Sequence, residues 1–288
     1  MPFLLKPSPY LSRNSAAILF IALWTLVVLS ILVVGIAGRI SSEISFVKYL
    51  ENRLFSFYLA KAAVSQAIIE LKDDKTKDYD TLYELRKQRK AILGEGAFEF
   101  YLTDEESLIN ISMPSMTMLE HLPGIDQVLA ELISKSSLKP FLLKEELLLV
   151  DGVTGEIFLE FKNLITTFSS GQVNINTAGQ DTLKALGLED DLVEIILRYR
   201  RGPDQLEASE DDGEFKDSAS ILNDLRKFTI LMVEQELQIA ELLSSNSLCV
   251  NSSNIRLNIS TQVHGKAAMK YAVILERATG KIKFWQEQ

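Results

Sequence analysis

The chain has 288 residues, enough for one large or two small domains, and its 30 basic and 39 acidic side chains give a formal net charge of −9 at pH 7. This charge disfavours non-specific binding to a nucleic-acid backbone, which would require a local basic surface. Cys249 is the only cysteine, so the sequence excludes an intrachain disulfide and a structural zinc site built from cysteines.

An uncharged hydrophobic segment extends from Ala16 to Ala37. As a helix, these 22 residues would be about 33 Å long, which is enough to cross the hydrocarbon core of a membrane. A cleaved secretory signal is the alternative, but its apolar core would be shorter, about 7 to 15 residues. Lys6 and Arg13 precede the segment and charges of both signs follow it. We therefore expect a cytoplasmic basic leader over residues 1–15 and a transmembrane helix over residues 16–38.

The same helix is predicted to continue beyond the membrane, over residues 39–75. Neither glycine nor proline occurs between Ile40 and Leu93, and large apolar side chains recur three, four or seven residues apart. This predicted stripe consists of Ile44, Val47, Leu50, Leu54, Phe57, Val64, Ile68 and Leu71. An amphipathic helix that packs only on its own domain gives the same pattern. Direct fusion to the spanning segment favours a surface for assembly with other helices.

Two segments, residues 94–111 and 245–288, predict the strands of a small antiparallel sheet. The first begins with a Gly94-Glu95-Gly96 turn, and the second contains short apolar runs joined by a hairpin turn at Ala278-Thr279-Gly280. Residues 112–244, which lie between them, have a helical pattern. The predicted fold class is therefore α+β, with a large helical insertion in a small sheet.

The helical insertion contains a weak internal duplication. Asn110-Ile111-Ser112 matches Asn174-Ile175-Asn176, and Leu122 with Gly124-Ile125 matches Leu186 with Gly187-Leu188. Two copies are too few for a solenoid, so the sequence predicts a pair of similar helical units. Thr177 and Gln180 have the spacing of a capping box, which predicts that a helix begins there.

Residues Val173–Arg200 resemble a helix-hairpin-helix. In DNA-binding versions, the hairpin presents backbone N–H groups and a helix N-terminus to a phosphate. Here Glu189, Asp190 and Asp191 follow the hairpin, and their carboxylates already satisfy the positive end of the helix. No nucleic-acid partner is expected.

Other candidate sites are weaker. Residues Pro203–Asp217 carry seven acidic side chains and one lysine without the ligand spacing of an EF-hand, which favours a solvated loop. His121 and His264 have no nucleophile or metal-ligand spacing around them, and the GxSxG, HExxH and Walker A motifs are absent from the sequence. We therefore assign no catalytic residue and no certain cofactor, and expect the protein not to be an enzyme.

Four motifs, in this order, suggest a family. They are Arg13 followed by SAAILFIALWTLVVLSILV, then YLTDEESLINI, then VNINTA with ALGLEDDLVEIILRYR, and finally YAVILERATGKIKFWQEQ. Over nearly its whole length the chain resembles the K-type minor pseudopilins of type II secretion, the general secretion pathway protein K family. The resemblance implies a pilin-like fold whose helical insertion contains helix-hairpin-helix or SAM-like units. It also implies a subunit at the pseudopilus tip that initiates assembly and supports protein export across the outer membrane.

The resemblance further implies partners and a location. The partners are the I-type and J-type minor pseudopilins, the major pseudopilin and the prepilin peptidase. The protein would cross the bacterial inner membrane once, with a cytoplasmic N-terminus and a periplasmic C-terminal domain. Members of the family can bind Ca²⁺ in the helical domain, but no residue of this chain is assigned as a ligand.

The leader would be cleaved within Arg13, Asn14, Ser15 and Ala16, although the family usually has glycine before the cleaved bond. Most pilins have glutamate at mature position five, whereas this chain has Leu19, Phe20 or Ile21 there, depending on the bond cleaved. The K type also lacks that glutamate, which suits a tip subunit. Two alternatives stay open: a minor pilin of a type IV pilus, and a membrane-anchored DNA-uptake receptor, which should end in a basic hairpin unit.

Overall fold

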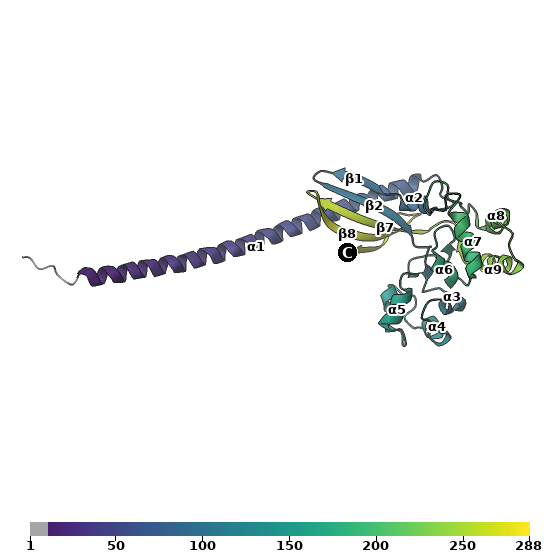
Figure 1. Ribbon diagram of the computed structural model, residues 1–288, viewed down its shortest axis with the longest axis horizontal. Coiled ribbons are helices and arrows are strands. Elements are labelled where there is room, and N and C mark those ends of the chain that lie inside the picture. Colours follow the sequence, from purple (N-terminus) through teal and green to yellow (C-terminus); the bar gives the residue numbers. More distant parts are fainter. Residues whose placement is uncertain (1–10) are drawn as a thin grey trace, which may run out of the picture. The chain divides into compact units, whose positions relative to one another are not determined.

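The computed structural model describes residues 11–288, with side chains from Ala16 onward, so most of the expected leader lies outside the described residues. The chain divides into two units, residues 1–55 and 56–288. Helix α1 (Leu11–Asp73) contributes residues to both units, and the second unit contains all the other described helices and strands (Figure 1).

In the first unit, α1 exposes large apolar side chains on every side between Ile18 and Ile36. The polar side chains in this stretch, Thr25 and Ser30, donate hydroxyl hydrogen bonds to backbone carbonyl oxygens one turn earlier, at 2.9 and 2.8 Å. Their hydroxyls therefore do not need water. By length and composition, α1 can cross a membrane.

In the second unit, the last part of α1 packs against the sheet with a narrow face of mainly small side chains. Ser56 lies within hydrogen-bond distance of Thr261, at 2.5 Å, and the rings of Phe57 and Trp285 meet edge to face, with centroids 5.4 Å apart. The buried positions recur at intervals of three and four residues and are Ser56, Leu59, Ala60, Ala63, Val64, Ala67 and Leu71.

This face corrects the predicted stripe. Of the predicted residues in this part of the helix, Val64 and Leu71 are buried, whereas Phe57 and Ile68 are half-buried at its margin. A search for large apolar side chains misses alanine and serine, which allow a helix to approach a sheet closely. The helix ends at Asp73, two residues before the predicted end.

The sheet has five antiparallel strands in the order β1-β2-β7-β8-β9. Its strands are β1 (Arg89–Leu93), β2 (Gly96–Asp104), β7 (Asn254–Val263), β8 (Lys266–Glu276) and β9 (Ile282–Glu287). Gly94 has φ +59° in the turn between the first two strands, a conformation that favours glycine. The sheet begins earlier than predicted, because Arg89–Leu93 forms an edge strand before this turn. Residues 245–253, predicted to belong to the sheet, lie outside it.

The helical insertion lies between β2 and β7 and consists of two units that each begin and end in a short strand. The first has β3 (Ile109–Asn110), α3 (Met116–Glu120), α4 (Gln127–Ser134), the 3-10 helix η1 (Lys144–Leu149), α5 (Gly155–Phe161) and β4 (Ile165–Thr166). The second has β5 (Val173–Asn174), α6 (Gln180–Ala185), α7 (Asp190–Arg200), the 3-10 helix η2 (Ser218–Ser220), α8 (Ile221–Phe228), α9 (Val233–Ser244) and β6 (Leu248–Cys249). A short helix, α2 (Leu82–Arg86), precedes the sheet.

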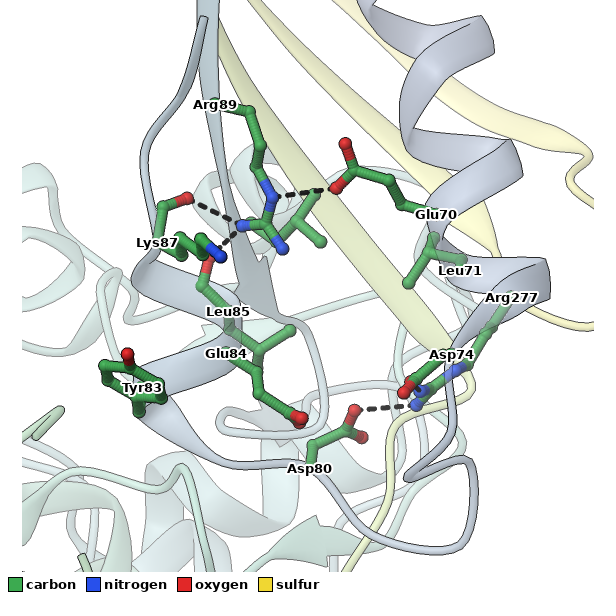
Figure 2. Close-up of a pocket in the computed structure, with 11 residues that line it drawn as sticks. Glu70, Leu71, Asp74, Asp80, Tyr83, Glu84, Leu85, Lys87, Arg89 and Arg277 are labelled. Atoms are coloured by element: carbon green, nitrogen blue, oxygen red, sulfur yellow. Dashed lines mark hydrogen bonds and ion pairs between the residues drawn. The ribbon is translucent and has the colours of Figure 1, made fainter. Parts of the chain in front are cut away.

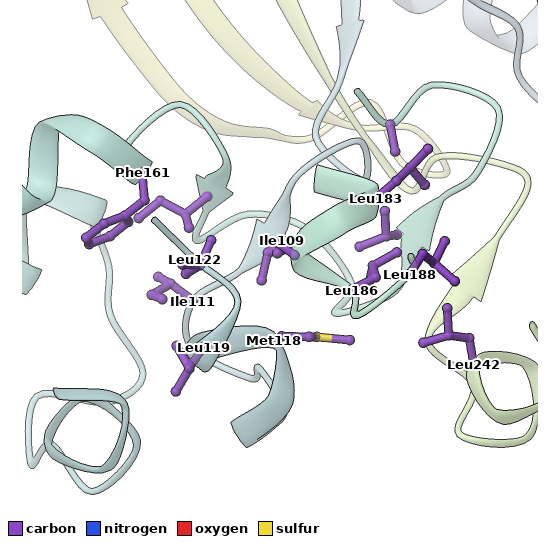
Figure 3. Close-up of a cluster of buried hydrophobic side chains, with 14 of the residues drawn as sticks. Ile109, Ile111, Met118, Leu119, Leu122, Phe161, Leu183, Leu186, Leu188 and Leu242 are labelled. Carbon is purple, nitrogen blue, oxygen red and sulfur yellow. The ribbon is translucent and has the colours of Figure 1, made fainter. Parts of the chain in front are cut away.

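The two helical units have the same kind of strand pairing. β3 pairs in parallel with β4, and β5 pairs in parallel with β6. The matched residues Asn110 and Asn174 form the same local hydrogen bond. The side-chain oxygen of each accepts from the backbone N–H two residues later, at 2.9 and 3.0 Å. Gly124 and Gly187 turn the two hairpins with φ +74° and +92°. The two units share one hydrophobic core, which includes Ile109, Ile111, Leu122, Leu183, Leu186 and Leu188 (Figure 3).

The predicted capping box at Thr177 is wrong. Helix α6 begins after Gly179, which makes no side-chain cap hydrogen bond. The Thr177 hydroxyl instead donates to the buried carboxylate of Asp104, at 2.5 Å. A long-range partner has replaced the local one.

Candidate functional site: an acidic junction and an apolar helix

Three consecutive carboxylates, Asp104, Glu105 and Glu106, lie where the chain leaves β2 and enters the helical insertion. Asp104 continues the buried face of β2, which alternates with exposed or half-buried positions. Asp80 lies near them in the fold, and all four side chains are at most 4% exposed. We call these four residues the acidic junction.

Asp104 ties the end of the sheet to the second helical unit. One carboxylate oxygen accepts from the Glu106 backbone N–H at 2.7 Å, and the other accepts from the Asn174 amide at 2.8 Å and from the Thr177 hydroxyl. A carboxylate with three donors is held in one orientation. Asp104 therefore fixes the start of the second helical unit of the insertion relative to β2.

Glu105 and Glu106 connect further segments. Glu105 pairs with Arg256 of β7 at 2.5 Å and accepts from the Thr166 hydroxyl of β4. Glu106 accepts from the Ser170 backbone N–H at 3.0 Å, and from both the backbone and the side-chain amide of Asn254 at 3.1 and 3.0 Å. The junction therefore joins both helical units to the sheet.

Asp80 connects the segment after α1 to the same region. It accepts from the Ser252 backbone N–H at 2.6 Å and pairs with Arg277 at 2.7 Å. Arg277 also pairs with Asp74, so one guanidinium joins the end of α1 to the segment after β8. Figure 2 shows this arginine in the wall of a cavity of about 300 Å³, with Glu84 and Arg89 also in its lining.

The junction contains more carboxylates than cationic partners, and this changes its protonation. Burial, and then the nearby Glu106 and Asp80 carboxylates, raise the pKa of Asp104 to about 8. Burial also raises the pKa of Glu106, and it raises the pKa of Asp80 despite the adjacent Arg277. Burial, together with the negative charge of Asp104, raises the pKa of the Cys249 thiol. The junction therefore favours retention of a proton where an exposed aspartate would have lost it.

The predicted assembly stripe divides between the two units. Ile44, Val47, Leu50 and Leu54 belong to the first unit, where their side chains are 44 to 60% exposed. Their assembly role stays a prediction. In the predicted cleavage region, Ala16 is exposed on α1, whereas the side chains of Arg13, Asn14 and Ser15 lie outside the described residues.

The second hairpin is acidic at its surface, as its sequence suggests. Glu189 occupies the N-cap position of α7 without a side-chain capping bond, and Asp190 pairs with Lys184 at 2.8 Å. The acidic loop that follows is held by its own side chains, with Asp212 accepting from the backbone N–H groups of Ala208 and Ser209. In the described part of the chain, no group of three or more histidine, cysteine or acidic side chains is arranged to hold a metal ion.

The acidic junction was not predicted as a site, although the sequence contains a signal for it. The alternation of Phe98, Phe100 and Leu102 extends to Asp104, so a period of two already places this carboxylate on the buried face. Its partners Asn174 and Thr177 lie about 70 residues away in the chain. No local pattern reveals such a pairing.

Comparisons with known proteins support the fold. No protein-family model matches the sequence, and no curated protein matches it either. One chain of a crystal structure, described as the GspK-GspI-GspJ complex from the enterotoxigenic Escherichia coli type 2 secretion system, is similar with a TM-score of 0.57 at 16% sequence identity. The match covers 85% of this chain and 98% of the other. The chain has a pilin-like α+β fold, with a long N-terminal helix, a small antiparallel sheet and a helical insertion.

Proposed function

We propose that the protein is a minor pseudopilin at the tip of a type II secretion pseudopilus. The observation that carries the proposal is the pilin-like fold with its helical insertion, which matches a chain of the GspK-GspI-GspJ complex over almost that chain's whole length. The four sequence motifs occur in the order typical of the K type. In this role, the protein starts pseudopilus assembly with other minor pseudopilins and supports export across the outer membrane.

The proposed location is the bacterial inner membrane. Helix α1 is long and apolar enough to span it, and Lys6 and Arg13 before the apolar segment favour a cytoplasmic N-terminus. The second unit then lies in the periplasm. The prepilin peptidase would remove the leader on the cytoplasmic side, close to Ala16.

The proposed partners are the I-type and J-type minor pseudopilins, with the major pseudopilin below them. In the first unit, Leu50 and Leu54 expose 44 and 58% of their surface. Apolar side chains this exposed on a regular helix can be buried by packing against other helices. The apolar residue at mature position five, Leu19, Phe20 or Ile21, lacks the charge that would bind a subunit above, which supports a capping position.

A matched pair of substitutions on α1 tests the assembly surface. Leu50→Glu places a charge in the predicted stripe, whereas Asn52→Glu places the same charge on the opposite side of the helix at a position that is also exposed. We expect the first variant to lose co-purification with the other minor pseudopilins and to abolish secretion. The second should retain both. Equal behaviour of the two variants would refute an assembly surface at Leu50.

The same co-purification distinguishes the alternative assemblies. A type IV pilus minor pilin has the same fold class, but its partners would be pilus subunits rather than secretion pseudopilins. Mass spectrometry of the complex isolated from membranes identifies which set is present. A set consisting only of type IV pilus subunits would overturn the secretion role and leave the pilin-like fold unaffected.

A further inference from the structure

A cavity between the two helical units contains no residue of the acidic junction in its lining. Its volume is about 200 Å³, and its walls come from the start of α3, the hairpin between α6 and α7, and α9 with the residues after it. We call it the insertion cavity. Its floor is apolar, because Met118, Leu186, Leu188 and Leu242 meet there, each at most 9% exposed (Figure 3).

The rim of the insertion cavity is polar but neutral over most of its length. Thr117, Gln238 and Ser247 contribute hydroxyl and amide groups. The Gln238 side-chain oxygen accepts from the Glu189 backbone N–H at 3.4 Å, which leaves its NH₂ group available as a donor. Neutral donors and acceptors above an apolar floor suit a peptide backbone whose side chain points inward.

The ionisable lining of the cavity is negative. Glu241 is the only ionisable side chain in the lining, it is exposed, and within the described part of the chain its carboxylate forms no ion pair. Glu189 and Asp191, just after the lining residue Leu188, add negative charge nearby. Such surroundings favour an occupant with a positive charge beside its apolar group.

The size of the cavity narrows the class of occupant. Pockets for whole small molecules usually measure about 300–1,000 Å³, so about 200 Å³ suits a single large side chain. We propose that the insertion cavity binds a short peptide segment of a partner protein, in which one large aliphatic side chain stands next to a lysine or arginine. The aliphatic side chain fills the cavity, the backbone contacts Thr117 and Gln238, and the cation faces Glu241. This proposal does not depend on the secretion role.

A peptide titration tests the proposal with the full chain in nanodiscs of zwitterionic lipid. The probe is a fluorescein-labelled peptide with the sequence Gly-Ser-Lys-Leu-Lys-Ser-Gly, followed by fluorescence anisotropy. Replacing its leucine by serine should weaken binding by about tenfold or more, because the buried aliphatic group is lost. Replacing both lysines by glutamate should also weaken binding. Equal affinity for the leucine and serine peptides, after subtraction of empty nanodiscs, would overturn the proposal.

Two substitutions on α9 provide a matched comparison. Glu241→Gln removes the charge in the cavity lining, whereas Glu234→Gln removes an exposed charge on the same helix outside the lining. The first should weaken binding of the lysine peptide by about two- to fivefold, the range for an exposed ion pair, and the second should leave it unchanged. Thr117→Trp, at an exposed rim position, should block the cavity and abolish binding. If both Glu241→Gln and Thr117→Trp leave the affinity for the peptide unchanged, the peptide binds outside the insertion cavity.

Discussion

At the scale of single residues, the acidic junction uses buried carboxylates to connect the sheet to the two helical units. Asp104 and Glu106 are buried and depend mainly on hydrogen bonds from amides and hydroxyls. Arg256 and Arg277 provide positive charge to Glu105 and Asp80, but no arginine among the described side chains pairs with Asp104 or Glu106. Burying these carboxylates while they are ionised costs free energy. The junction therefore gains fixed geometry and becomes sensitive to pH.

The direction of this sensitivity follows from Asp104. Its pKa is about 8 in the folded protein and 3.8 in the absence of perturbation. Between these values the unfolded chain has released a proton that the folded chain retains, so stability falls as pH rises. The slope is at most about 1.4 kcal/mol per pH unit. Calorimetry of the full chain in nanodiscs should show a Tm several degrees lower at pH 8 than at pH 5.

The control is Asp104→Asn, which removes the titrating group and keeps its shape. Because the Asn174 amide and the Thr177 hydroxyl both donate to one carboxylate oxygen, an amide nitrogen there would lose these bonds. We expect a variant with a lower Tm at pH 5 and a shallower dependence of Tm on pH. The remaining dependence would come from Glu106 and Asp80, whose pKa values are also raised. A wild-type Tm that rises from pH 5 to pH 8 would contradict protonation of the junction.

At the scale of elements, the two hairpin units have similar topology and different surfaces. In the first, Asp126 caps α4 by accepting from the Leu129 N–H at 2.8 Å. In the second, Glu189 makes no such bond, and Asp190 and Asp191 occupy the first turn of α7. Carboxylates in the first turn complement the helix dipole and oppose the approach of a phosphate. The hairpin fold alone therefore does not predict DNA binding.

We expect no measurable binding of random duplex DNA by the full chain in nanodiscs at physiological salt. Triple substitution of Glu189, Asp190 and Asp191 by glutamine should remove the local repulsion and serves as a comparison. The electrophoretic mobility of the DNA, at two salt concentrations, measures the binding of the wild type and of the triple variant. Salt-sensitive micromolar binding by the wild type would favour the DNA-uptake alternative.

The sequence predicts elements best where one local pattern decides them. The uncharged run from Ala16 to Ala37 predicts a long apolar helix, and the alternation after Gly96 predicts β2, as the structure confirms. The matched Asn110 and Asn174 predict the paired units. Prediction was poorer for the packing face of α1, because Ala60 and Ala63 have no distinctive hydrophobic signal. It also missed the junction, whose long-range bonds join residues 61 to 197 positions apart.

At the scale of the whole molecule, processing of the N-terminus tests membrane anchoring. The short basic segment before an uninterrupted apolar run predicts removal of about a dozen residues, with the hydrophobic segment retained. Mass spectrometry of the membrane-bound protein should find a mature N-terminus within Ser15–Ala17. A terminus near Gly38 would instead show an ordinary secretory signal and exclude a pilin-like anchor.

A tip subunit also differs from a shaft subunit in number and position. A chain with an apolar mature position five and a helical insertion on its head should begin a filament and not repeat along it. Gold labelling of an epitope placed after Gln288, on pseudopili isolated from secreting cells, measures this most directly. We predict a single label at one end of each filament, in complexes that also contain the other minor pseudopilins. Labels repeated along the shaft, or pseudopili that form normally without the protein, would contradict the tip role.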